Sequence, residues 1–291
     1  MYRSMPYKVF SYCNYACLFI LSALCVLPLI HVLAISLSSS AAATGNIVTF
    51  WPVHFTFEAY TETLGNSNFL HALWIGIKRV VLGTSLSMLL VVLAAYPLSK
   101  EETRFQGRTF YAWLFVFTML FHAGLIPTYL VVKGTGLMNT IWALVLPGAV
   151  SIWNLILMLN FFRAIPKELE EAALMDGASH LRILFTIYLP ISMPAVATLS
   201  LFAMVTHWNA WFDGMIYLSN ASDYPISTFL RSIIVSENFS VLGLTEDEIK
   251  NISPRTVKAS QVFIGALPIL LVYPFLQRYF VKGVILGSVK E

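Results

Sequence analysis

Long apolar segments, recurring six times along the chain, constrain its fold more than any other feature. A helix needs about 20 mostly apolar residues to cross a bilayer. Only 11% of the residues are charged, against about 25% in a soluble domain. Because a bilayer satisfies no backbone polar group, we expect an all-α, polytopic membrane protein with six transmembrane helices in a single domain, 1–291. The expected spans are about 12–37, 70–97, 110–132, 140–162, 191–219 and 258–280.

The distribution of lysine and arginine predicts the orientation of these spans, because cytoplasmic loops retain them. With both termini in the cytoplasm, the inner segments carry eleven of these residues and the outer segments carry five. The long first outer segment, 38–69, carries none. Both termini are therefore predicted to be cytoplasmic. The loop 163–190 then lies in the cytoplasm and the loop 220–257 lies on the periplasmic side.

Two adjacent basic residues, Lys78 and Arg79, fall inside the second apolar segment. A charge at mid-bilayer costs a few kcal/mol and often marks a functional site. A shifted boundary offers a simpler interpretation, in which 80–97 crosses the bilayer. Both long side chains would then extend to the outer surface, and we favour this interpretation over an ion path.

The loop 163–190 contains a short helix with recognisable start and stop signals. Pro166 can open a helix because its missing amide needs no partner there, and acids follow it in the first turn, where they complement the helix dipole. Gly177 predicts a left-handed stop. A second short helix is expected from Ser179. The acids disfavour binding to a negatively charged lipid surface, so this helix is predicted to contact a protein.

The alanines Ala172 and Ala173 give this helix a face with almost no bulk. A partner surface could approach its backbone closely there. Together with the charged first turn, this face indicates a protein contact in the cytosol and not a catalytic centre.

The spacing of this loop resembles that of a known family. The loop contains Glu171-Ala172-Ala173, then three residues, Gly177, nine residues, Ile187, one residue and Leu189-Pro190. This pattern looks like the EAA loop of ABC importer permeases. Its Asp176-Gly177-Ala178 form and the C-terminal segment 277–290 resemble the carbohydrate-uptake branch, in particular the second permease of maltose-type, oligo- or polysaccharide importers. The resemblance implies a type I importer permease fold. It also implies a coupling helix that contacts the ATPase through Glu170, Glu171, Ala172, Ala173, Met175, Asp176, Gly177, Ala178, Leu189 and Pro190.

The sequence contains no G-x-x-x-x-G-K-[ST] phosphate-binding loop. The resemblance therefore implies that ATP and magnesium bind to partner subunits and that this chain is not an enzyme and holds no cofactor or metal. Its implied partners are a second, homologous permease, two cytoplasmic ATP-binding subunits, an extracytoplasmic solute-binding protein and a saccharide. The implied location is the bacterial cytoplasmic membrane.

An aromatic and polar cluster near the outer half of the fifth span is the candidate saccharide path. Aromatic faces stack on sugar C–H groups while amides and carboxylates pair with hydroxyls. The alternative interpretation is an aromatic belt at the membrane surface. The cluster comprises Trp208, Asn209, Trp211, Phe212, Asp213 and Tyr217. In the periplasmic loop, the candidate contacts to the binding protein are Asp223, Arg231, Glu237 and Asn238.

Other classes of protein remain as alternatives. An ABC permease for a non-sugar solute shares most of these features. A secondary transporter would need more ionisable residues within the spans and inverted repeats. An intramembrane enzyme would need a clustered polar site. A net charge of +3 offers no basic surface for nucleic acid. The size and charge of the saccharide stay open, an acidic polysaccharide included.

Overall fold

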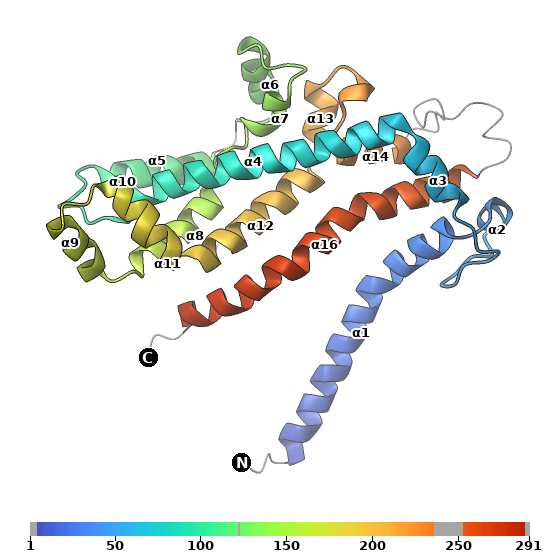
Figure 1. The fold of residues 1–291 in the computed structure, drawn as a ribbon, viewed down its shortest axis with the longest axis horizontal. Coiled ribbons are helices and arrows are strands. Elements are labelled where there is room, and N and C mark those ends of the chain that lie inside the picture. Colours follow the sequence, from blue (N-terminus) through green and yellow to red (C-terminus); the bar gives the residue numbers. More distant parts are fainter. Residues whose placement is uncertain (1–4, 122, 236–252, 289–291) are drawn as a thin grey trace. The chain divides into compact units, whose positions relative to one another are not determined.

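The computed structural model describes residues 5–121, 123–235 and 253–288, with side chains throughout except at Val235 and 276–288. These residues contain helices and no strand (Figure 1). The expectation of an all-α protein is therefore confirmed for the described part of the chain. The chain divides into two compact units, Met1–Leu70 with Leu230–Leu267 and His71–Phe229 with Pro268–Glu291.

The first unit is built around one long apolar helix and the segments that follow it. Hydrophobic side chains remain exposed along most of the first helix, as expected of a helix that meets lipid or another protein on all sides. A small core forms at its end, where hydroxyl groups join distant segments. Ser260 Oγ donates to the carbonyl of Ala59 at 3.0 Å, and the amide of Ser253 donates to Ser40 Oγ at 2.8 Å. The complete helices here are α1 Met5–Ser36, α2 Ser40–Thr44 and α3 Glu58–Gly65.

The second unit holds most of the remaining helices. Three helices run on across the division between the units: α4 Ser67–Ser99, α14 Ile226–Val235 and α16 Pro254–Ser288. The helices wholly inside the second unit are α5 Arg108–Leu120, α6 Leu125–Gly134, α7 Ile141–Val145, α8 Ile152–Arg163, α9 Lys167–Met175, α10 His180–Ile183, the π-helix η1 Leu184–Tyr188, α11 Leu189–Ile191, α12 Met193–Asn209, α13 Phe212–Tyr217 and the 3-10 helix η2 Ala221–Asp223.

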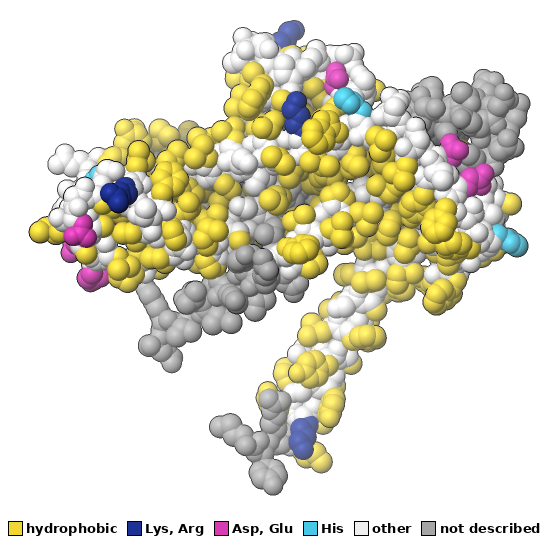
Figure 2. All heavy atoms as spheres, viewed as in Figure 1, with side chains coloured by type: hydrophobic (Ala, Val, Ile, Leu, Met, Phe, Trp, Pro, Cys, Tyr) yellow, Lys and Arg dark blue, Asp and Glu magenta, His cyan; other side chains and the backbone are white. Residues whose placement is uncertain are grey.

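The largest hydrophobic core joins the second half of α4 to α8, η1 and α12. Val91 and Ala95 of α4, Met158 of α8 and Leu184 of η1 are almost completely inaccessible to solvent. Burial of a valine, leucine or methionine side chain of this kind contributes about 1.5–3 kcal/mol. Charged side chains gather near α9, whereas hydrophobic ones dominate the surface along α4 (Figure 2). The loop with the predicted coupling helix therefore extends from an apolar helix bundle.

In the described part of the chain, fewer than six helices are long and apolar enough to cross a membrane as single spans. Among the described residues, three helices are long and apolar enough to cross a membrane, or up to five if each bent pair counts as one span. The predicted span 140–162 is divided into α7 and α8, because Pro147 interrupts the helix. Between α11 and α12 the chain bends by 84°. Six spans and cytoplasmic termini stay predictions.

Candidate functional site: the α9 loop and the charged residues around α4

The helix α9 begins and ends where local signals predict. Pro166 precedes its first residue, Lys167. At its end Gly177 adopts φ +77°, which an L residue with a side chain rarely takes. The amide of Gly177 donates to the carbonyl of Leu174, and the amide of Ala178 donates to the carbonyl of Ala173, both at 3.0 Å. This pair of hydrogen bonds is the Schellman motif that stops a helix at a glycine.

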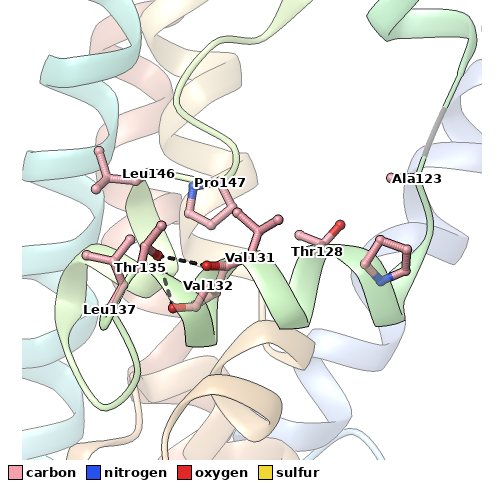
Figure 3. A pocket seen from close by; sticks show the side chains of 9 residues that line it. Ala123, Thr128, Val131, Val132, Thr135, Leu137, Leu146 and Pro147 are labelled. Atoms are coloured by element: carbon pink, nitrogen blue, oxygen red, sulfur yellow. Dashed lines mark hydrogen bonds between the residues drawn. The ribbon is translucent and has the colours of Figure 1, made fainter.

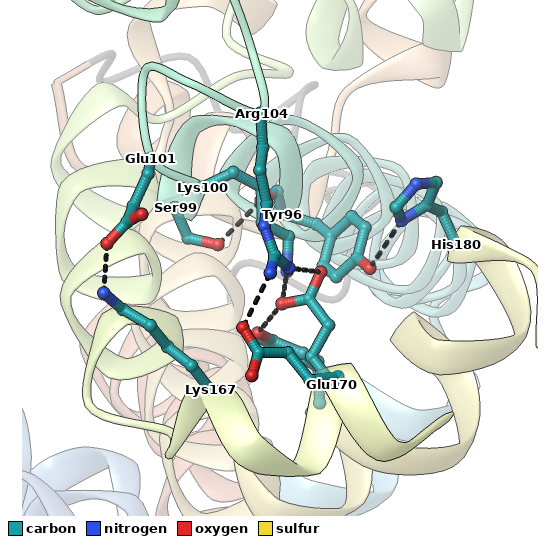
Figure 4. Close-up of polar contacts among 10 residues, drawn as sticks. Tyr96, Ser99, Lys100, Glu101, Arg104, Lys167, Glu170 and His180 are labelled. Carbon is teal, nitrogen blue, oxygen red and sulfur yellow. Dashed lines mark hydrogen bonds and ion pairs between the residues drawn. The ribbon is translucent and has the colours of Figure 1, made fainter. Parts of the chain in front are cut away.

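Glu170 turns into the protein, although most residues of α9 are exposed. Only 3% of the residue is exposed. Its Oε2 accepts hydrogen bonds from Lys100 Nζ and Tyr188 Oη, each at 2.7 Å. Arg104 lies 3.9 Å from its Oε1 and donates to the neighbouring Glu171 at 2.7 Å. Glu170 thus fastens α9 to the segment that follows α4 (Figure 4).

The ammonium of Lys100, which binds Glu170, lies in an aromatic cage formed by Tyr96 and Tyr188. It lies 3.9 Å from the ring centroid of Tyr96 and 4.0 Å from that of Tyr188. Cation–π contacts of this kind stabilise a desolvated cation. His180, at the start of α10, lies 3.4 Å from Tyr96 Oη. The cage therefore joins α4, α9, α10 and η1 at one point (Figure 4).

The balance of charge in this cage is visible in the pKa values. Burial alone would raise the pKa of Glu170, but the hydrogen bonds from Lys100 and Tyr188 and the charges of Lys100 and Arg104 outweigh it and lower the pKa. Burial lowers the pKa of Lys100, and its contact with Glu170 opposes that shift. The carboxylate is therefore held ionised by its partners.

The opposite face of α9 is exposed. Met175 is 88% exposed, and Leu169 and Ala172 also face solvent. Ala173 differs from the prediction, because it is half-buried against the main core. The low-bulk face therefore consists of Ala172 without Ala173. Of the other predicted coupling residues, Glu171, Asp176, Gly177 and Pro190 are exposed, whereas Ala178 and Leu189 pack against the core.

Arg79 contradicts the predicted extension to the surface. Its side chain is only 2% exposed and forms an ion pair with Asp213, whose Oδ1 accepts from Nη1 at 3.1 Å. Nη1 also donates to the carbonyl of Ala210 at 2.8 Å, and Leu144 O lies 3.5 Å from Nη2. Lys78 is exposed. The prediction for Arg79 was wrong because an acid distant in sequence offers it a closer partner than the surface does.

The pair Arg79–Asp213 lies at a break in the predicted fifth span. The helix ends at Asn209 and resumes at Phe212, which frees carbonyl groups at the break. A broken helix at membrane depth is tolerated only where protein groups satisfy the freed backbone. Arg79 donates to Ala210, and Thr228 Oγ1 donates to the carbonyl of Trp211 at 2.8 Å. The carbonyl groups of Ala210 and Trp211 at the break are thus hydrogen-bonded.

Close packing at this break also explains one glycine. A Cβ on Gly214 would lie 2.2 Å from Thr228 Oγ1, well inside any real contact. Only glycine lets α14 approach α13 so closely.

The predicted saccharide path is only partly assembled. Trp208 and Tyr217 are buried, and Tyr217 packs with Tyr129 at 6.5 Å between ring centroids. Asn209 and Phe212 are exposed, and Trp211 is half-buried. Asp213 pairs with Arg79. The six residues therefore differ in exposure and in partners, and their role in the path stays a prediction.

A polar cavity near the first half of α4 was missed by the sequence analysis. Its volume is about 250 Å³, and it is lined by His71, Trp74, Lys78, Asn139 and Asp223, among others. The sequence did indicate part of this cavity, because His71, Trp74 and Lys78 lie at positions i, i+3 and i+7, on one face of the helix. Trp74 is 62% exposed. Asn139 holds φ +60°, and its Oδ1 accepts from the amide of Ser219 at 2.7 Å.

A larger cavity of about 390 Å³ lies between α6 and α7 (Figure 3). Its lining is apolar apart from two threonines. Thr135 Oγ1 donates to the carbonyl of Val131 at 2.9 Å, and Thr128 Oγ1 donates to that of Gly124 at 2.8 Å. Both hydroxyls are thus used by their own helix. This cavity suits an apolar occupant more than a sugar.

The predicted contacts to a binding protein are described only in part. Asp223 lies in η2 and lines the polar cavity. Arg231 is exposed on α14. Glu237 and Asn238 lie outside the described residues. Within the described residues, no group of three or more histidine, cysteine or carboxylate side chains could hold a metal ion.

Comparison with known proteins identifies the family. The model of the binding-protein-dependent transport system inner membrane component matches residues 105–286. The chain is 40% identical to the polygalacturonan/rhamnogalacturonan transport system permease protein YtcP of Bacillus subtilis, over 98% of this chain and 100% of the relative. It is 37% identical to protein LplC of the same organism, over 100% of this chain and 98% of the relative.

A solved structure agrees with this family. A chain from the crystal structure of a bacterial ABC transporter involved in the import of the acidic polysaccharide alginate superposes with a TM-score of 0.88 and 32% identity, covering 96% of this chain and 99% of that one. These findings define the class, the multi-pass membrane permeases of ABC importers. The chain belongs to the family of binding-protein-dependent transport system inner membrane components. The resemblance inferred from the EAA loop is confirmed.

Proposed function

We propose that this chain is the permease subunit of a saccharide importer in the bacterial cytoplasmic membrane. It would work with a second permease, two ATP-binding subunits and an extracytoplasmic solute-binding protein. The names of its relatives support a saccharide cargo, because they include a polygalacturonan/rhamnogalacturonan permease and an alginate transporter. Both termini and the α9 loop would lie in the cytoplasm.

The geometry of α9 carries the proposal that it is the coupling helix. One side is fastened by Glu170 to Lys100 and Tyr188, while Met175 and Ala172 on other sides are exposed. A partner that moved α9 would therefore also move the end of α4 and, through η1 and α11, the start of α12. ATP-driven closure of the partner subunits would in this way shift the permease between inward-facing and outward-facing states.

Replacing Gly177 tests this role. Gly177→Val forces a β-branched residue into a left-handed conformation, although nothing lies within 4 Å of the added Cβ. We expect the variant to insert and assemble normally but to lose at least about 90% of saccharide uptake in proteoliposomes, since α9 can no longer end at this turn. Gly177→Asn is the matched control, because asparagine tolerates the same conformation. Wild-type uptake by the valine variant would refute the coupling assignment.

The polar cavity on α4 is the best-supported saccharide contact of this chain. An exposed tryptophan beside a lysine, an amide and a carboxylate is a suitable surface for a sugar ring. From Lys78 to Ser99 the helix is continuous, and the 21 steps between these two residues span about 31 Å, close to the thickness of about 30 Å of a bilayer's hydrocarbon core. If α9 faces the cytoplasm, this cavity opens near the outer surface.

Truncating Trp74 tests the saccharide contact. Trp74→Ala should raise the KM for saccharide uptake about two- to tenfold, given about 0.5–1.5 kcal/mol for an aromatic contact, with kcat little changed. Trp51→Ala, which removes another exposed tryptophan, should leave both constants unchanged. Equal KM values for wild type and Trp74→Ala would rule this cavity out as part of the path.

A further inference from the structure

The pocket behind α9 carries more positive charge than its own carboxylates neutralise. It has a volume of about 280 Å³ and lies where α4, α5, α8 and α9 meet. Among its lining residues are five bases and three acids: Lys100, Arg104, Arg108, Arg163 and Lys167, with Glu101, Glu170 and Glu171.

Each acid of this pocket already has a basic partner. Glu170 binds Lys100 at 2.7 Å and Glu171 binds Arg104 at 2.7 Å, while Glu101 pairs with Lys167. Two bases are left over. Within the described part of the chain, neither Arg108 nor Arg163 forms an ion pair with a carboxylate.

The two remaining guanidinium groups make few contacts. Arg108 Nη1 donates to the carbonyl of Lys100 at 3.0 Å, but its buried Nε makes no hydrogen bond among the described residues. Among the described residues, Arg163 donates to the carbonyl of Leu98 alone, at 3.5 Å. Burial lowers the pKa of Arg163, and the positive charge of Arg108 lowers this pKa further. The pocket therefore concentrates two positive charges with hydrogen-bond donors to spare.

The surroundings of the pocket indicate a membrane surface. Arg108 is the first residue of α5, a helix with no buried residue. Directly after it, Phe110 and Trp113 are largely exposed. Exposed aromatic side chains next to basic ones are typical of the level of lipid headgroups. Basic pockets between helices on the cytoplasmic side bind anionic headgroups in other membrane proteins.

We propose that Arg108 and Arg163 bind the phosphate of an anionic phospholipid, whose acyl chains lie along the exposed apolar face of α5. A guanidinium pair matches a phosphodiester well, because arginine donates two parallel hydrogen bonds. The pocket is also lined by Lys100 and Glu170, so the bound lipid lies against the contacts that hold α9. Lipid binding would thus stabilise the attachment of α9. This site is independent of the cargo.

Native mass spectrometry of the assembled transporter tests the site. The complex is released from nanodiscs of phosphatidylcholine with about a quarter phosphatidylglycerol, a composition that supplies a negative surface. We expect the wild type to retain at least one phosphatidylglycerol that Arg108→Gln/Arg163→Gln loses. Lys133→Gln, which removes an exposed lysine elsewhere, should retain it. Equal retention by all three proteins would overturn the proposal.

Two further measurements separate folding and free anions from lipid binding. Arg108→Lys/Arg163→Lys keeps both charges but loses the paired donors, so it should fold normally and retain the lipid more weakly than the wild type. In pure phosphatidylcholine discs, inorganic phosphate should stabilise the complex against heat less than phosphatidylglycerol does. If phosphate alone raised the melting temperature as much, the site would bind a soluble anion and the assignment to lipid would be wrong.

Discussion

Two buried charges, Glu170 and Arg79, are stabilised in different ways. Glu170 is an acid in a loop helix, and its partners are an ammonium, a phenol and a nearby guanidinium. Arg79 is a base inside a long helix, and its partners are one carboxylate and backbone carbonyls. The first charge connects a surface helix to the bundle. The second charge donates to a backbone carbonyl that is freed at the break between α12 and α13.

The difference shows what each region can tolerate. Around Glu170 several donors share one carboxylate, so the loss of one contact leaves others. Around Arg79 the single carboxylate of Asp213 balances the charge, and the freed carbonyl at Ala210 depends on the same side chain. We therefore expect Arg79 to matter for folding and Glu170 to matter for the attachment of α9.

Removing Arg79 should have the largest effect. Arg79→Met leaves Asp213 without its cation and Ala210 O without its donor, and breaking a buried ion pair on one side costs up to about 3–5 kcal/mol, less where the remaining charge is 27% exposed, as Asp213 is. We expect a matching fall in the free energy of unfolding, measured by circular dichroism in mixed detergent micelles.

The double variant Arg79→Met/Asp213→Leu is the control for this prediction. Replacing both members of a buried pair by apolar residues is often close to neutral. It should therefore recover part of the lost stability. If Arg79→Met alone unfolded like the wild type, the comparison between the two regions would fail.

Replacing Glu170 should have a smaller effect. Glu170→Gln keeps the shape and an oxygen that can accept a hydrogen bond, but it removes the negative charge beside Lys100 and Arg104, and hydrogen bonds to charged groups contribute about 1.5–3 kcal/mol. We expect that loss, seen as faster hydrogen exchange in α9. The matched control is Glu171→Gln at the next position. It removes an exposed ion pair and should cost less than about 1 kcal/mol.

The pH dependence distinguishes a lost charge from altered packing. Because the pKa of Glu170 is lowered in the folded protein, its stabilisation is present above the usual glutamate pKa of 4.5 and is lost as pH falls through the lower, folded value. The difference in exchange between wild type and Glu170→Gln should therefore be constant from neutral pH down to about pH 5 and should vanish in stronger acid. A difference that persisted in strong acid would indicate a packing effect.

The α9 loop could be predicted from sequence because its signals are local. Pro166, Gly177 and Ser179 act on their own turns of backbone, and each has the predicted role in the structure. The inward turn of Glu170 and Ala173 could not be predicted, because it depends on Lys100 and Tyr188 in other segments.

The membrane helices were predicted less well for a related reason. Hydropathy detects apolar length but not where a helix breaks, so the division of 140–162 into α7 and α8 was missed. The pairing of Arg79 with Asp213 joins positions far apart in the chain. A base and an acid both placed inside apolar segments were the available clue, since each is costly without a partner of opposite charge.

The continuity of α4 has a mechanical consequence. Between Lys78 and Ser99 the helix is unbroken, so it behaves as a lever of about 31 Å. A tilt of about 5° imposed where Lys100 meets Glu170 would displace the cavity beside Trp74 by about 3 Å over that length. The two ends of α4 are thereby connected by rigidity alone, without any chain of rearranging side chains between them.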